Sequence, residues 1–223
     1  MKKEFREYIL AIIFSSMFFL TAVSCSKDKF FDVKEVVLTF DDAPNFPENT
    51  ARILDVLQKH QTKATFFCIG EYLRMYPDLA HRIATEHDMG NHTYTHIRVG
   101  DHDLSSIYEY EIHQTQLLID SLQPYNRHYF RPPCSSLTSL QKLELINKGF
   151  DVVMWDLSAE EWDPKVSTQQ VLDYFHKNLN RAAQIPIILF HLNKSTYEAL
   201  DILLGEFEQS GIKVITLNTL KGK

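Results

Sequence analysis

Val36-Val37-Leu38-Thr39-Phe40-Asp41-Asp42 is an apolar run that ends in two adjacent carboxylates. Adjacent residues of a strand point to opposite faces, so this pair can act together only if the strand ends here and the chain turns. Ala43-Pro44-Asn45 is a turn sequence and fits that requirement. An Asp-Asp pair at such a place can be a turn former, a helix cap or part of a catalytic site.

Further along the chain, apolar runs alternate with segments of helical period. We expect strands at residues 35–40, 64–69, 89–91, 128–130, 151–155, 185–190 and 213–217. Helices are predicted at residues 50–60, 78–87, 104–122, 138–148, 167–181 and 197–209, the third with Glu and Gln on its outer face. This alternation predicts a single α/β domain of about seven parallel strands with helices outside, as a barrel or an open doubly wound sheet.

The first two dozen residues differ in composition from the rest. Three basic residues precede an apolar run over residues 8–23, which ends at Ser24-Cys25-Ser26. This layout predicts a secretory signal at residues 1–24, a tether at 25–32 and a folded domain at 33–223. Ala22-Val23-Ser24-Cys25 resembles a bacterial lipoprotein processing site, in which Cys25 would carry the lipid; plain cleavage and a retained membrane anchor are the alternatives. Export across the inner membrane to the cell envelope, in the periplasm or at the cell surface, would follow.

Charge and cysteine content exclude other classes of function. A formal net charge of −6 argues against nucleic-acid binding, which depends on clustered Lys and Arg. Apart from Cys25, the chain has Cys68 within a strand-like run and Cys134 in a loop. We expect no disulfide between them, because Cys68 fits the role of a small buried hydrophobe.

Polar side chains that could carry chemistry recur where predicted strands end. Asp41 and Asp42, His92 and His96, Arg131, Asp156 and His191 all follow such strands. The carboxyl ends of parallel strands form the edge where ligands and catalytic groups collect. His92 and His96 are four residues apart, so on a helical turn both rings could bind one cation, and a carboxylate from the Asp pair would complete a His-His-Asp site. His191 could instead be a core histidine with a polar partner.

In this order the residues resemble the motifs of the polysaccharide deacetylase family (NodB-homology domain, carbohydrate esterase family four). The matching stretches are Thr39-Phe40-Asp41-Asp42-Ala43-Pro44, Ala64-Thr65-Phe66-Phe67, Gly90-Asn91-His92-Thr93-Tyr94-Thr95-His96, Arg131-Pro132-Pro133, Trp155 to Trp162, and Ile188-Leu189-Phe190-His191. The resemblance covers about residues 35–217. It implies a distorted (β/α) barrel of about seven strands and hydrolysis of acetyl groups on sugar polymers.

The resemblance also implies a role for each matching residue. Asp42, His92 and His96 would bind a divalent metal, Zn²⁺ or Co²⁺. Asp41 would be the general base and His191 the general acid. Arg131 would steady Asp41, and Glu161 of the fourth motif would orient His191. Substrate contacts would come from Pro133, Cys134, Trp155 and Trp162, with the backbone N–H at residue 134 holding the oxyanion.

Three positions depart from the family pattern. Ala43 stands where the family has Gly in the turn, and Glu161 stands where it has Asp. Cys134 stands in place of an aromatic residue, and Ser135 in place of Gly. The loss of the aromatic wall at Cys134 could change the substrate. The resemblance implies an enzyme that deacetylates an N-acetylated glycan, peptidoglycan or a chitin-like oligosaccharide, at the cell envelope. The alternatives are an esterase for O-acetylated, xylan-type polysaccharides and a glycan-binding lipoprotein without turnover.

Overall fold

The structure is a computed structural model that describes residues 31–124 and 127–222. The expected signal peptide and the lipid site at Cys25 lie outside the described residues. Phe31, at the start of the described chain, is buried against Phe207. Within the described chain, no helix has both the length and the apolar character needed to cross a bilayer.

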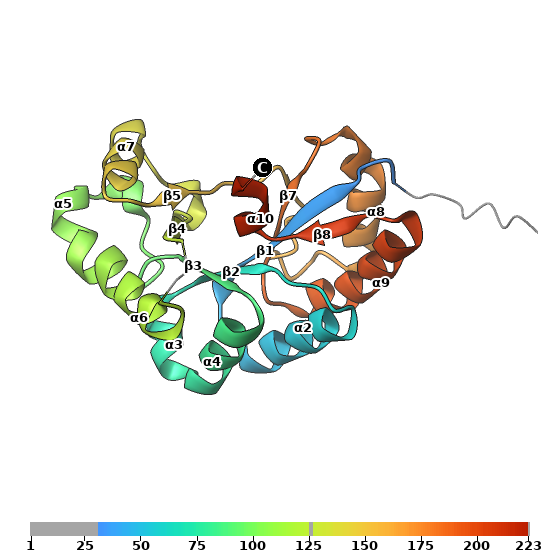
Figure 1. Cartoon of the computed structure of the whole chain (residues 1–223), viewed down its shortest axis with the longest axis horizontal. Helices are drawn as coiled ribbons and strands as arrows, with labels where there is room; N and C mark the ends of the chain where they lie inside the picture. Colours follow the sequence, from blue (N-terminus) through green and yellow to red (C-terminus); the bar gives the residue numbers. More distant parts are fainter. Residues whose placement is uncertain (1–30, 125–126, 223) are drawn as a thin grey trace, which may run out of the picture.

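Parallel strands make up the centre of the molecule. The strands are β1 (Glu35–Ala43), β2 (Thr65–Cys68), β3 (Asp88–Asn91), β4 (Tyr129–Phe130), β5 (Asp151–Val152), β6 (Leu157–Ser158), β7 (Ile187–Phe190) and β8 (Lys213–Ile215). Seven of them follow the order β5-β4-β3-β2-β1-β7-β6, and β8 pairs with the first three residues of β1. All pairings are parallel, and the sheet curls into a distorted half-barrel (Figure 1). The prediction of an α/β barrel of about seven parallel strands is therefore confirmed.

Helices surround the outside of the curved sheet (Figure 1). They are α2 (Pro47–Lys59), α3 (Gly70–Met75), α4 (Pro77–Glu86), α5 (Leu104–Ile107), α6 (Gln114–Leu122), α7 (Ser139–Asn147), α8 (Thr168–Asn178), α9 (Lys194–Ser210) and α10 (Leu217–Lys221). Thr138 with Gln141 and Ser167 with Gln170 form the capping boxes that begin α7 and α8. Gly211, at φ 72°, ends α9.

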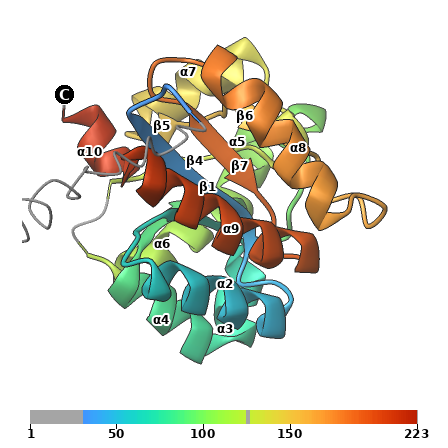
Figure 2. The same ribbon diagram turned by 90° about the vertical axis from the view of Figure 1, so that its right-hand side faces the viewer.

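The main core lies between the sheet and the outer helices. Phe40 of β1 stacks between Phe66 and Phe190 of the neighbouring strands, with ring centroids 4.9 and 5.7 Å away. α8 and α9 lie side by side (Figure 2), and Phe175 of α8 packs on Phe190. A smaller cluster, in which Leu217 of α10 is completely buried, also contains residues of β1, β2 and β4. Cys68 is buried and Cys134 exposed, and both are free thiols, as expected.

Two predicted strands end two or three residues earlier than expected. The strand at 151–155 ends at Val152, because the carbonyls of Val153 and Met154 accept hydrogen bonds from Arg131 in place of a neighbouring strand. The strand at 213–217 ends at Ile215, because the Thr216 side chain accepts from the N–H of Thr219 and begins α10.

The prediction of one regular helix over 104–122 is wrong. Tyr108–His113 between α5 and α6 is π-helical. Glu111 and Gln116 are buried, so the Glu and Gln residues do not all lie on the outer face. Helix α3 was not predicted, since its six residues are too few to show a helical period.

Candidate active site

Asp41 and Asp42 reach the same site although the strand does not end before them. β1 continues to Ala43, but a β-bulge lies between Phe40 and Ala43, where β1 has one residue more than β2. Asp42 also has a left-handed backbone, with φ 64°. A bulge changes the direction in which the following side chains point. The predicted turn is present, since the N–H of Asn45 donates to the carbonyl of Asp42 at 2.8 Å. The bulge and the backbone of Asp42 come before it and explain why both carboxylates face one side.

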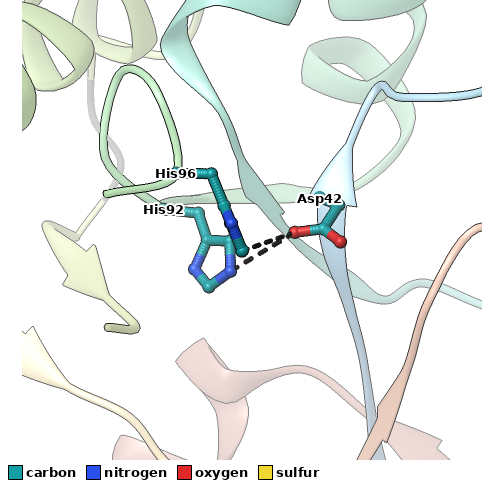
Figure 3. Close-up of side chains that lie close together, drawn as sticks. All are labelled: Asp42, His92 and His96. Carbon is teal, nitrogen blue, oxygen red and sulfur yellow. Dashed lines mark ion pairs between the residues drawn. The ribbon is translucent and has the colours of Figure 1, made fainter. Parts of the chain in front are cut away.

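Asp42, His92 and His96 bring three possible ligand atoms together (Figure 3). Oδ1 of Asp42 lies 3.5 Å from Nε2 of His92 and 3.2 Å from Nε2 of His96. The three ligand atoms all lie within 4.8 Å of one another. Oδ1 is buried and has no well-aligned hydrogen-bond donor in the described part of the chain. A carboxylate and two imidazoles that converge in this way are the donor set of a divalent metal with open coordination positions.

The hydrogen bonding of His92 supports this donor set. Its Nδ1 lies 2.7 Å from the carbonyl oxygen of Arg131, which can only accept, so Nδ1 carries the proton. Nε2 then has a free lone pair directed at the site. Burial lowers the pKa of His92 against the opposing effect of Asp41 and Asp42, which keeps the ring neutral. Burial raises the pKa of Asp42, but the close contact with Nε2 of His96 and the charges of the nearby histidines outweigh burial and lower this pKa, so Asp42 is ionised.

The predicted helical turn between His92 and His96 is wrong. These residues form an irregular loop in which Thr93 and His96 have φ of 63° and 62°. The rings converge because of these two left-handed residues, with centroids 5.1 Å apart. Asn91 and Glu111, which the sequence analysis did not select, both bind the backbone of this loop. The spacing of residues 104, 107, 111 and 115 would have placed Glu111 on the buried helix face.

Asp41 forms a buried ion pair with Arg131. Nη1 of Arg131 lies 2.7 Å from Oδ1 of Asp41 and 2.9 Å from Oγ1 of Thr39. Arg131 is completely buried, and its guanidinium lies over the Phe67 ring at 4.1 Å and the Trp155 ring at 5.5 Å. Several contacts therefore fix the orientation of Arg131, and with it that of Asp41.

His191 and Glu161 form a second buried pair. Oε1 of Glu161 accepts from the backbone N–H of His191 at 2.6 Å and lies 3.2 Å from its Nδ1. Burial lowers the pKa of His191, but the hydrogen bond and charge of Glu161, with Asp41 and Asp42, outweigh it and raise the pKa above its usual value. Nδ1 is used by Glu161, so Nε2 is the nitrogen available for proton transfer. The longer side chain of Glu161 reaches His191 as the resemblance requires.

Two cavities of about 600 Å³ each meet at these residues. One contains the metal-ligand triad with Asp41, Cys134 and Trp155, and the other extends past Phe46 to the starts of α8 and α9. Asp42, Trp162 and His191 line both cavities. Pro133, expected in the substrate groove, is buried and lines neither cavity, whereas Pro132 lines the first. The structure thus brings together every other residue of the expected site.

Comparison with known proteins identifies the class. The family model "Polysaccharide deacetylase" matches residues 29–153, and the chain belongs to this family. It is 31% identical over 192 residues to the peptidoglycan-N-acetylglucosamine deacetylase of Bacillus cereus, covering 83% of this chain and 68% of that protein. It is 28% identical to the peptidoglycan-N-acetylmuramic acid deacetylase PdaC of Bacillus subtilis, covering 84% of this chain but 39% of PdaC. Both relatives are named as enzymes.

Solved structures give the same result. The Bc1960 peptidoglycan N-acetylglucosamine deacetylase has a TM-score of 0.76 and 30% identity, covering 85% of this chain and 88% of that chain. BA3943 of Bacillus anthracis, described as a CE4 family pseudoenzyme, has a TM-score of 0.75 and 26% identity, covering 85% of this chain and 66% of that one. The family thus includes a member described as a pseudoenzyme. Family membership alone therefore does not establish turnover, which has to be argued from the site residues of each chain.

Proposed function

We propose that this protein is a metal-dependent deacetylase of an N-acetylated glycan, peptidoglycan or a chitin-like oligosaccharide. The observation that carries the proposal is the Asp42-His92-His96 triad with Asp41 beside it. Relatives named as deacetylases of peptidoglycan and of chitooligosaccharides support the substrate class. Zn²⁺ fits a donor set of two imidazoles and one carboxylate, and Co²⁺ would occupy the same geometry.

The residues of the site supply the remaining chemistry. A divalent metal held by the triad would polarise the acetyl carbonyl and lower the pKa of water. Asp41, held by Arg131, would accept the proton of the attacking water. His191, protonated and held by Glu161, would donate a proton to the leaving amine. These two groups would therefore act as separate base and acid.

The backbone N–H of Cys134 would stabilise the developing oxyanion. In the described part of the chain this N–H donates to no acceptor, and Cys134 lies at φ 52° in a short turn beside the triad. Since this interaction uses the backbone, the thiol in place of an aromatic side chain leaves it available. The change at Cys134 therefore affects the groove wall rather than the chemistry.

The two cavities support an oligomeric substrate. They extend from the reacting groups in two directions, with Trp162 between them. Trp162 and Phe46 expose 60% and 58% of their surface beside the cavities. Aromatic faces of this kind stack on sugar rings. One sugar unit would lie at the triad and its neighbour on the chain beyond Trp162.

Acetate release tests the function. Metal-loaded protein should release acetate from N-acetylated chitooligosaccharides or from peptidoglycan fragments, and Asp41→Asn should abolish it. Glu109→Ala, a change of an exposed acid outside both cavities, is the matched control. Release from acetylated xylan alone would indicate the O-acetyl esterase. Binding of a glycan without acetate release would indicate the glycan-binding lipoprotein without turnover.

The cellular location is part of the same proposal. The basic and apolar character of residues 1–24 supports export, and Ser24-Cys25 supports a lipid anchor in the cell envelope. Metabolic labelling with a fatty-acid analogue tests the anchor, with Cys25→Ser as the variant. Label retained in Cys25→Ser would reject Cys25 as the lipid site.

A further inference from the structure

The loop between β3 and Ile97 needs support because its backbone is strained. Thr93 and His96 both have left-handed φ values, which residues with a Cβ rarely adopt. Between them, Tyr94 and Thr95 connect the two histidines of the triad. Strained residues persist where surrounding contacts hold them, so the contacts of this loop decide where His96 lies.

Helix α3 holds the loop from one side. The N–H groups of Gly70 and Glu71 donate to the carbonyls of Thr93 and Tyr94, each at 3.0 Å. A Cβ on Gly70 would lie 2.5 Å from the Tyr94 ring, so glycine permits this close approach. These bonds satisfy the loop carbonyls but leave its N–H groups without acceptors from α3.

Glu111 holds the loop from the other side. Its Oε2 accepts from the N–H groups of Tyr94 and Thr95 at 3.0 and 2.9 Å, and its Oε1 accepts from the Thr95 hydroxyl at 2.8 Å. Glu111 is 9% exposed and forms no ion pair with Lys or Arg among the residues the structure describes. Its charge is therefore stabilised by the loop itself, through charge-assisted hydrogen bonds.

The π-helical segment places Glu111 at this position. In Tyr108–His113 the chain takes a wider turn than in an α-helix. The carbonyl of Ile112 in this segment accepts from Nδ2 of Asn91 at 2.8 Å, and Oδ1 of Asn91 accepts from the N–H of Thr93 at 3.0 Å. The same segment thus binds both the first turn of the loop, through Asn91, and its middle, through Glu111.

We propose that Glu111 is a positioning residue of the metal centre, which holds the loop in the conformation that brings His96 to Asp42. This inference rests on the proposed metal site. His92 is fixed independently, since its N–H donates to the carbonyl of Cys68 and its Nδ1 to that of Arg131. The His96 side chain is 36% exposed and lies against the other members of the triad. Loss of Glu111 therefore displaces His96 and leaves His92 in place.

Three variants of the full chain test the proposal. Glu111→Ala removes all three contacts. Glu111→Gln retains them, because its amide oxygen can accept from both N–H groups and its NH₂ can donate to the Thr95 hydroxyl. Glu109→Ala is the matched control, since Glu109 belongs to the same π-helical segment but is exposed and pairs with His113.

Zn²⁺ affinity, measured by competition with a chelator, is the first readout. Glu111→Ala should bind Zn²⁺ about 10- to 100-fold more weakly, the usual effect of losing a group that orients a ligand. Its Co²⁺ complex should show an altered visible spectrum, and saturating metal should restore part of the turnover. Glu111→Gln and Glu109→Ala should behave as wild type. Wild-type Zn²⁺ affinity and an unchanged Co²⁺ spectrum in Glu111→Ala would overturn the proposal.

Amide hydrogen exchange in metal-free protein is the second readout. The N–H groups of Tyr94 and Thr95 should lose protection in Glu111→Ala but not in Glu109→Ala, and unchanged protection would reject the positioning role. If Glu111→Ala does not fold, Glu111→Asp serves instead, because its shorter side chain does not reach both N–H groups. Wild-type protein that binds no Zn²⁺ would reject the proposed function, while hydrogen exchange would still decide whether Glu111 holds the loop.

Discussion

Asp41 and Asp42 are adjacent, but we predict that substituting them has different effects on stability, metal binding and turnover. Asp41 pairs with a completely buried Arg131, whereas the Asp42 side chain is 28% exposed and faces the histidines. Removing one partner of a buried ion pair costs about 3–5 kcal/mol, because the remaining charge is left unpaired. Asp41→Ala should therefore be destabilised by about that amount, and Asp41→Asn by about 1–3 kcal/mol, since the amide oxygen can still accept from Arg131.

Turnover and metal binding complete this prediction. Asp41→Asn should retain Zn²⁺ and lose about 10²- to 10⁴-fold in kcat, the contribution of a general base. Asp42→Asn should lose Zn²⁺ affinity, while the free energy of unfolding of its metal-free form should change by less than about 1 kcal/mol, since no buried cation loses a partner. Urea unfolding in the presence of chelator, Zn²⁺ competition and acetate release measure the three quantities. Equal loss of Zn²⁺ in both variants, or equal destabilisation, would refute this division of roles.

Three further predictions concern pH dependence and the groove. Glu161→Gln removes the charge that raises the pKa of His191, so His191 should lose its proton at lower pH and the alkaline limb of kcat/KM should move to lower pH; an unmoved limb would assign it to another group. His87 is buried, which lowers its pKa to about 4, so its contribution to stability is present above pH 6.5 and is lost as the pH falls towards 4. That loss amounts to about 3 kcal/mol, and urea unfolding of His87→Phe should show a shallower decline below pH 6.5 than wild type. Trp162→Ala should raise KM for a tetrasaccharide more than for a disaccharide, and an equal effect on both would argue against stacking beyond the reacting unit.

The sequence was sufficient to predict which side chains gather at the site, but not the backbone conformation that brings them together. Apolar runs followed by polar residues correctly indicated which side chains gather at the carboxyl edge, because that edge is a property of every parallel sheet. The bulge at Asp42 and the left-handed residues Thr93 and His96 were not visible, since they depend on pairing with β2 and on contacts with α3 and Glu111. Local pattern cannot report contacts between segments so distant in the chain.

The burial of Glu111 and the early end of one strand have the same origin. The period of residues 104–122 indicated a helix. A single acidic residue on its inner face needs hydrogen-bond donors from elsewhere in the fold, and the sequence pattern does not reveal these donors. In the same way, Val153 and Met154 are apolar enough for a strand, yet their carbonyls bind the guanidinium of Arg131. In both cases a tertiary hydrogen bond decides the backbone conformation.

The position of Arg131 has a consequence for judging related chains. Arg131 follows β4 and binds the carbonyls of Val153 and Met154, so it connects β4 to the segment between β5 and β6. In the described chain, β5 and β6 are the two ends of the strand order and are not paired with each other. Arg131 is therefore part of the wall of the half-barrel as well as a partner of Asp41. A chain that had lost turnover would still gain stability from these contacts of the arginine. Its retention in a relative is thus weak evidence of activity, whereas an acid at position 42, whose loss should leave the fold stable, would be more informative.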